Sequence, residues 1–274
     1  MSRSLRDVTL WSGLVLVGMI VLTALVAMVW TPFDPIRVTP ERLAPMSSRH
    51  WLGTDAYGID ILSQLMSGAR TCLLVGMVSV AIAALVGIPL GLVIGIGGDR
   101  WWARLLLRIS DMLYALPALL LAILLAAALG ASTTTAMAAI GIATIPVFVR
   151  MTRAGTMQVM TRDYVASARV SGIGWPAIAW QHILPNVAPL LGVQASVSFA
   201  TAILAEAALS YLGLSTPSTT PTWGRMINEA QRAIYTSPEL TVWPALAIGM
   251  AVLGFNLLGD GLRDRLDPLL KEVS

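Results

Sequence analysis

Residues 164–185 (YVASARVSGIGWPAIAWQHILP) combine small, basic and hydroxyl-bearing side chains between two long apolar runs. Small residues such as Ala166 would let a helix seat deeply in a cleft of another protein, where Arg169 would pair with acidic groups. Gly172 allows the chain to reverse between two short helices, and Pro185 then begins the next apolar run. The alternative is an amphipathic loop on the membrane surface, with its basic residues toward anionic lipid. Residue types alone leave both interpretations open.

Glu206 lies close to the end of an apolar run. A charged side chain at the centre of a bilayer costs about 2.5 to 3.5 kcal/mol, so this carboxyl group should face the bundle interior or a wet cavity, or be protonated. It could line a translocation path or cap a neighbouring helix. It could equally hydrogen-bond the loop that follows Tyr211. The sequence leaves these roles open.

Motifs for several other chemistries are absent from the sequence. There is no G-x-x-x-x-G-K-S/T loop for ATP, no paired-histidine or C-x-x-C spacing for a metal, and no G-x-S-x-G nucleophile elbow. Cys72 is the only cysteine, cannot form an internal disulfide, and is expected to pack as a small apolar residue. We therefore predict a chain that is not an enzyme and that binds no cofactor or metal of its own.

Composition indicates a protein that crosses a membrane several times. Of the 274 residues, 56% are apolar and only 12% are charged, and the mean hydropathy is +0.76. These values lie far from those of an average soluble protein. The net charge of +3 comes with arginines clustered between apolar runs, which indicates orientation in a membrane rather than nucleic-acid binding.

The spans follow from the lengths of the apolar runs. Trp11 and Trp30 bracket the first run about 28 Å apart at 1.5 Å per residue, close to the thickness of the hydrocarbon layer. That length, with no small-x-small site after it, argues against a cleaved signal peptide. We predict an all-α membrane protein with six transmembrane helices, over residues 10–30, 71–97, 105–129, 134–149, 187–209 and 242–258.

Basic residues orient these spans. One set of connections, which includes both termini and residues 151–186, holds twelve of the 18 Lys and Arg residues. By the positive-inside rule this side is cytoplasmic. Residues 31–70 and 211–241 are then predicted to lie outside. Within the first of these connections, residues 59–66 are amphipathic and predict a short interfacial helix.

From His50 onward the chain resembles the dipeptide, oligopeptide and nickel family of ABC-importer permeases, specifically its shorter, C-type subunit. Five blocks in this order carry the resemblance: HWLGTDAYGIDILSQLMSGAR at 50–70, RISDMLYALPALLLAI at 108–123, QHILPN at 181–186, ILAEAALSYLGLSTPSTTPTWGRMI at 203–227 and GFNLLGDGLRDRLDP at 254–268. Residues 164–185 resemble the EAA loop, which inserts into a cleft of the ATPase subunit. Ala166 replaces the glutamate of that motif, and His182 replaces an isoleucine, as in the peptide-transporting branch.

The resemblance implies a type I ABC-importer permease fold. Residues 1–70 would supply an N-terminal helix and outer loop, and residues 71–274 the permease domain, with a coupling loop at about 151–186 and an outer loop at about 211–241. It implies that the ATPase-coupling residues are Asp163, Ala166, Ser167, Ala168, Arg169, Gly172, His182, Leu184 and Pro185. It implies that a binding protein docks near Trp223, Arg225, Asn228 and Arg232.

The implied assembly lies in the bacterial inner (plasma) membrane. It contains a second permease subunit as heterodimer partner, two ATP-binding subunits that hold ATP and Mg²⁺, and an extracytoplasmic solute-binding protein. The expected solutes are di- and oligopeptides. Nickel, a metal chelate, glutathione or another small solute remain alternatives, because the spans do not separate them. A stand-alone secondary transporter or channel is a further alternative, which would need more intramembrane ionisable groups than the nearly solitary Glu206.

Overall fold

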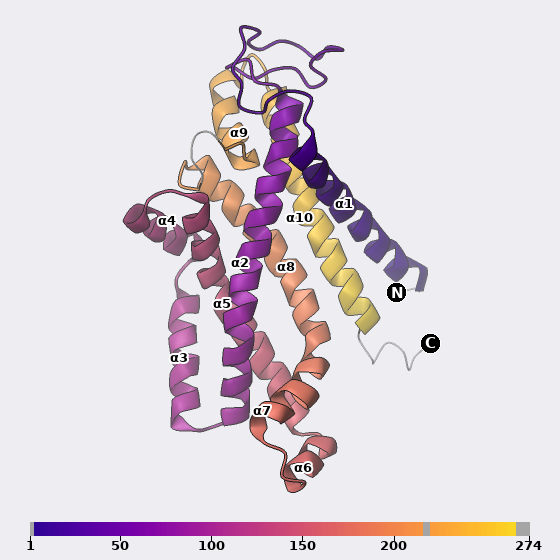
Figure 1. Cartoon of the computed structure of the whole chain (residues 1–274), viewed down its shortest axis with the longest axis vertical. Coiled ribbons are helices and arrows are strands. Elements are labelled where there is room, and N and C mark those ends of the chain that lie inside the picture. Colours follow the sequence, from indigo (N-terminus) through magenta and orange to yellow (C-terminus); the bar gives the residue numbers. More distant parts are fainter. Residues whose placement is uncertain (1–2, 216–219, 267–274) are drawn as a thin grey trace.

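The computed structural model describes residues 3–215 and 220–266, which form a bundle of long helices (Figure 1). The described part of the chain contains no β-strand, and the predicted all-α membrane fold is confirmed. A π-helical turn (Ala179–Ile183) joins helix α7 (Trp175–Ile178) to helix α8 (Leu184–Tyr211), and a 3-10 turn (Gln231–Ala233) follows helix α9 (Trp223–Ala230). In chain order the α-helices are α1 (Arg3–Val29), α2 (Ile61–Gly97), α3 (Trp101–Ala115), α4 (Ala118–Leu129), α5 (Thr133–Met160), α6 (Asp163–Val170), α7 (Trp175–Ile178), α8 (Leu184–Tyr211), α9 (Trp223–Ala230) and α10 (Glu239–Leu266).

The third predicted span is not one straight helix. Within the described residues, five helical segments are long and apolar enough to cross a membrane, and α3 with α4 makes a sixth only if this bent pair counts as one span. The two helices meet at 85°. Leu116 has an extended backbone (ψ 126°), because Pro117 disfavours the helical conformation at the residue before it. The prediction of a single helix over residues 105–129 is therefore wrong, and α4 projects sideways from the bundle (Figure 1).

Helix α2 begins ten residues earlier than the predicted span. Asp60 caps its first turn, because its Oδ2 accepts hydrogen bonds from the backbone N–H of Ser63 at 2.8 Å and from the Ser63 hydroxyl at 2.7 Å. The amphipathic stretch at 59–66 is thus the start of a spanning helix, and the prediction of a separate interfacial helix is wrong. The predicted domain boundary at residue 70 falls within α2.

The fifth apolar run belongs to a longer helical segment, Trp175–Tyr211, of 37 residues. Ahead of Pro185 the helix widens into a π turn, in which the N–H of Leu184 donates to the carbonyl of Ala179. A wider turn accommodates the proline ring and its missing N–H without ending the helix. The chain therefore does not restart at Pro185, and α8 continues directly from the segment that precedes it.

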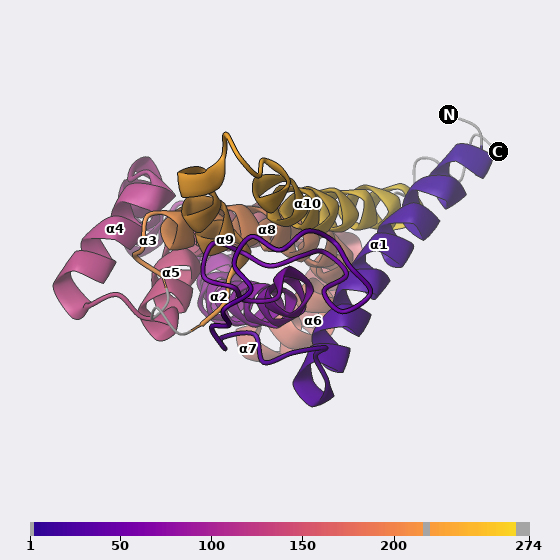
Figure 2. The same ribbon diagram turned by 90° about the horizontal axis from the view of Figure 1, so that it is seen from above.

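Glycines bring two pairs of helices into close contact. Along α2, Gly87, Gly91 and Gly95 face α5, so the two backbones approach as in other small-xxx-small packings. Between α1 and α10, a Cβ atom at Gly13 would lie 2.5 Å from the backbone nitrogen of Leu258. In the view from above, α1 crosses the bundle next to α10 (Figure 2).

The two ends of the bundle carry different elements (Figure 1). One end holds α6 and α7. The other holds α9 and residues 31–60, which fold back over the start of α2. The first residues of α1 and the last of α10 lie together, away from residues 31–60.

His50 holds residues 31–60 to the start of α2. Its side chain is buried, its Nδ1 lies 2.9 Å from Oδ1 of Asp60, and its Nε2 lies 3.3 Å from a carboxylate oxygen of Glu41. The ring of Phe33 stacks on the imidazole at 4.4 Å, and the Phe33 N–H donates to the hydroxyl of Ser63. Asp60 therefore fixes the loop and caps the helix with the same carboxylate.

Candidate functional site

Helix α6 ends in a tight reversal at Gly172. The N–H of Gly172 donates to the carbonyl of Arg169 at 3.0 Å, and the N–H of Ile173 donates to the carbonyl of Ala168 at 3.1 Å. These two bonds form a Schellman motif, which requires a left-handed residue at its centre. Gly172 supplies it with φ +80°. The predicted reversal between two short helices at this glycine is confirmed.

One face of α6 packs against its own chain. Val165 and Ala168, three residues apart, are buried in a cluster with Ile178, Ile183 and Val187. Ala168, a predicted coupling residue, packs its methyl group between α6 and the segment of α7 and α8, and its role in ATPase coupling stays a prediction. The surface on which α6 packs is thus apolar and belongs to the same chain.

The opposite face of α6 is exposed. It carries Asp163, Ala166, Ser167, Arg169 and Val170, and Val170 is 90% exposed. The Arg169 guanidinium lies over the ring of Trp175, 4.7 Å from its centroid, so its charge is held beside α7.

Further apolar side chains are exposed at this end of the bundle. Trp180 is 72% exposed and Tyr164 is 43% exposed, beside the exposed Val170. Val170 and Trp180 were not among the predicted coupling residues, and the only sequence signal for each is a bulky apolar side chain among small and polar ones. Exposed apolar groups rimmed by polar ones mark sites that contact another protein or the membrane surface.

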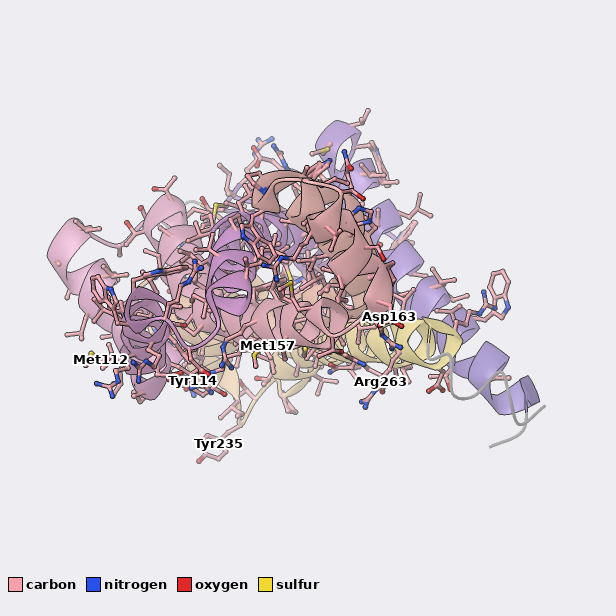
Figure 3. The ribbon with its side chains drawn as sticks, turned by 90° about the horizontal axis from the view of Figure 1, so that it is seen from below. Met112, Tyr114, Met157, Asp163, Tyr235 and Arg263 are labelled. Atoms are coloured by element: carbon pink, nitrogen blue, oxygen red, sulfur yellow. The ribbon has the colours of Figure 1, made fainter. Side chains whose placement is uncertain are left out.

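A groove opens beside this exposed face, between α5, α8 and α10. Its volume is about 580 Å³, and its lining includes Arg162, Tyr164, Pro185 and Arg263. In the view from below, Asp163 and Arg263 both lie at this end of the molecule (Figure 3). Pro185, a predicted coupling residue, is exposed on the wall of this groove.

His182 lies on the π turn between α7 and α8. Its ring is 6.1 Å from the ring of Tyr164, and its carbonyl accepts a hydrogen bond from the side-chain amide of Asn186 at 2.7 Å. Among the described residues, its Nε2 atom is buried and has no hydrogen-bond partner. His182 and the neighbouring Leu184 are half-buried, and Leu184 packs against the cluster that holds Val165 and Ala168.

At the other end of the bundle, α9 and the 3-10 turn that follows it present two of the four predicted docking residues to solvent. Asn228 is exposed, as is Arg232, which donates to the hydroxyl of Tyr57 at 2.9 Å. Arg225 is partly buried and pairs with Glu229 at 2.7 Å.

Trp223, the remaining predicted docking residue, is buried. It is only 4% exposed, and its indole N–H donates to the carbonyl of Leu65 at 3.0 Å. Its ring fills the space above Gly68 of α2, and its role in docking a binding protein stays a prediction. Trp223 therefore supports α9 from inside the bundle.

The model of the binding-protein-dependent transport system inner membrane component matches residues 87–272, which is most of the chain. This chain belongs to that family. It is a membrane permease of an ABC importer, as the order of its sequence blocks predicted.

Named relatives of this permease are similar over nearly its whole length. It is 40% identical to the dipeptide transport system permease protein DppC of Alkalihalophilus pseudofirmus, over 94% of this chain and 85% of that one. It is 42% identical to the di/tripeptide transport system permease protein DppC of Pseudomonas aeruginosa, over 96% and 88%. It is 42% identical to the glutathione transport system permease protein GsiD of Escherichia coli, over 82% and 74%.

A solved structure shares the fold of this permease. A chain of the MetNI methionine ABC transporter, in an inward-facing conformation, superposes with a TM-score of 0.61 at 16% identity. The match covers 74% of the permease and 96% of that chain. The predicted type I ABC-importer fold is thus confirmed.

Glu206 of the permease lies near the α9 end of α8 and is 2% exposed. Its Oε1 accepts a hydrogen bond from the hydroxyl of Ser210 at 2.7 Å and one from the hydroxyl of Ser215 at 3.4 Å. Ser215 belongs to the loop after Tyr211, so this geometry is that of the loop-bonding alternative. A place for Glu206 on the translocation path stays a prediction.

Proposed function

We propose that this permease imports di- and oligopeptides as one half of a heterodimer, driven by two ATP-binding subunits that carry ATP and Mg²⁺. The exposed face of α6 is the observation that carries the proposal, because that helix is seated on its own chain by Val165 and Ala168 and turns polar and apolar groups outward. A short helix with such a face is suited to insertion into a cleft of another protein.

The proposed motion begins at this helix. An ATP-binding subunit on the cytoplasmic side contacts Asp163, Ala166, Ser167 and Arg169. When the two ATP-binding subunits close on ATP, this contact displaces α6. Because Val165 and Ala168 pack against Ile178 and Ile183, the displacement passes to the helical segment Trp175–Tyr211. The helices then rock as rigid bodies between outward-open and inward-open states. In this orientation both termini are cytoplasmic and α9 faces outward.

Peptides are the proposed solutes because the named relatives at 40% and 42% identity over the greater part of this chain are dipeptide and di/tripeptide permeases. Glutathione is the second candidate, since GsiD proteins match at 42% over 82% of the chain. An extracytoplasmic binding protein would deliver either solute to the surface of α9 around Asn228 and Arg232.

Uptake by the reconstituted complex tests the proposal. The permease, its partner permease and the ATP-binding subunits are placed in liposomes with ATP inside, and the binding protein is added outside with labelled dipeptide, glutathione or Ni²⁺. ATP-dependent dipeptide accumulation supports the proposal. Accumulation of Ni²⁺ without competition by peptide would contradict the solute assignment. Transport by this chain alone, driven by an ion gradient, would contradict the ABC mechanism.

A further inference from the structure

Helix α9 is fastened to α8 through a buried chain of hydrogen bonds that starts at Glu206. Oε1 of Glu206 accepts from the hydroxyl of Ser210, and the hydroxyl of Ser210 accepts from that of Thr222 at 2.8 Å. Thr222 is the N-cap of α9, because its hydroxyl accepts the N–H of Arg225 at 3.3 Å. Three buried side chains therefore link the last turns of one helix to the first turn of the next.

Backbone packing holds the same two helices together. A Cβ atom at Gly224 would overlap the carbonyl group of Ala207, so α9 lies directly on the backbone of α8. On its other side, α9 is fixed to α2 by the bond from Trp223 to the Leu65 carbonyl and by a bond from the Thr71 hydroxyl to the Pro221 carbonyl at 3.3 Å. Glu206 thus sits where α8 meets an outer helix that is packed on both sides.

The opposite end of the same helical segment lies in the coupling region. Trp175–Tyr211 is one segment, with Ile178 and Ile183 beneath α6 and Glu206 near its other end. A displacement at α6 reaches α9 only if the contact between α8 and α9 is stiff. The hydroxyl of Thr222 makes the side-chain hydrogen bond that crosses to α8, and the bond from Ser210 to Glu206 orients the hydroxyl that accepts it.

We infer that Glu206 is a positioning residue that makes α8 and α9 move as one unit, so that binding-protein docking at α9 and ATP hydrolysis beneath α6 are coupled. This inference rests on the proposed function. Glu206 acts through Ser210 and Thr222 and needs no contact with the transported solute. Loss of its acceptor oxygens leaves Ser210 of α8 without the group that orients its hydroxyl, so the bond from Thr222 to Ser210 loses its support.

The test uses the complete reconstituted complex with three permease variants. Glu206→Leu removes both acceptor oxygens at similar volume, Glu206→Gln keeps one acceptor, and Ser210→Ala breaks the link to Thr222. Ser196→Ala is the matched control, because the Ser196 hydroxyl is also buried on α8 but donates to the Phe255 carbonyl of α10 at 2.6 Å. The readouts are the basal rate of ATP hydrolysis and the rate stimulated by the loaded binding protein.

Glu206→Leu and Ser210→Ala are expected to lower the stimulated rate by up to about tenfold, the effect of losing one buried hydrogen bond, with the basal rate within about twofold of wild type. Glu206→Gln and Ser196→Ala should retain stimulation. Full stimulation in Glu206→Leu would overturn the positioning role. Equal loss of the basal and stimulated rates in Glu206→Leu and Ser210→Ala would also overturn it, because it would indicate a purely structural effect.

A spin-label measurement separates this inference from the proposed function. Labels at the exposed positions Leu204 on α8 and Asn228 on α9, in a Cys72→Ala background, report the distance between the two helices. Glu206→Leu should broaden that distance distribution relative to Ser196→Ala, and an unchanged distribution would overturn the positioning role alone. A wild-type complex whose ATP hydrolysis ignores the binding protein would overturn the proposed function, and this inference with it.

Discussion

Gly91 of α2 lies against Thr152 of α5 so closely that a Cβ atom at Gly91 would be 2.5 Å from the Cβ of Thr152. The same Cβ atom at Gly91 would be 2.8 Å from the carbonyl oxygen of Val149. The contact is therefore with backbone as well as with a side chain, and a small rotamer change cannot relieve it. This pair of residues fixes the spacing of α2 and α5, which form the most extensive helix contact in the described chain.

Gly91→Ala is therefore expected to destabilise the permease. Overpacking of a close contact typically costs about 1 to 3 kcal/mol, so the midpoint of thermal unfolding in detergent should fall. Gly192→Ala is the control, because a Cβ atom at Gly192 of α8 meets no other atom within 4 Å. A Gly91→Ala protein as stable as Gly192→Ala would contradict the close packing of α2 and α5.

The reversal after α6 gives a second prediction. An Ala side chain at φ +80° is strained by about 1 to 2 kcal/mol, so Gly172→Ala should reduce the population of the reversed conformation about 5- to 30-fold. Uptake by the complex should fall, while thermal unfolding of the bundle stays unchanged, because a Cβ atom there meets nothing within 4 Å. Gly174→Ala is the matched control, since its φ is −71°. Equal uptake by the two variants would show that the Gly172 conformation is unimportant.

Asp60 is expected to control the order of residues 31–60. Asp60→Ala removes the cap of α2 and leaves the buried His50 without its closer carboxylate partner, which together should cost about 2 to 4 kcal/mol. Amide hydrogen exchange of residues 31–60 should quicken by at least about tenfold. Asp99→Ala, at an exposed position, should leave that exchange unchanged. Unaltered exchange in Asp60→Ala would mean that other contacts hold the loop.

Trp223→Phe tests the inward placement of this side chain. The variant loses the hydrogen bond to the Leu65 carbonyl, worth about 0.5 to 1.5 kcal/mol, and part of the packing on Gly68. The thermal midpoint should therefore fall relative to Trp51→Phe, since Trp51 is 62% exposed. If Trp223→Phe instead kept full stability and lost only binding-protein affinity, Trp223 would be a docking residue after all.

The fold class and the order of the spans could be predicted because they depend on long apolar runs and on blocks of sequence that stay together. The residues at which the helices begin and end could not be predicted. Two of the apolar runs begin at Thr71 and at Val187, whereas the helices that contain them begin earlier in the chain. The first of these helices starts in a polar stretch where Asp60 caps its first turn, and the second passes Pro185 because a π turn precedes the proline. The bend at Pro117 was missed because it interrupts an otherwise uniformly apolar run.

The candidate site was predictable as a segment but not as a surface. The position of α6 and the reversal at Gly172 follow from small residues and a glycine. Which side of α6 is buried depends on Ile178 and Ile183, which come from the following helical segment, so the burial of Ala168 could not be predicted. The burial of Trp223 could not be predicted, because the sequence does not show that Gly68 leaves room for its ring.

Photo-crosslinking from the exposed face of α6 tests the central claim most directly. A photoreactive amino acid at Ser167 is irradiated in native membranes, with Val29 at the far end of α1 as the control position. The account predicts an adduct between position 167 and an ATP-binding subunit, and no such adduct from position 29. Adducts from position 167 with lipid alone, in membranes where the ATP-binding subunits copurify with the permease, would contradict it.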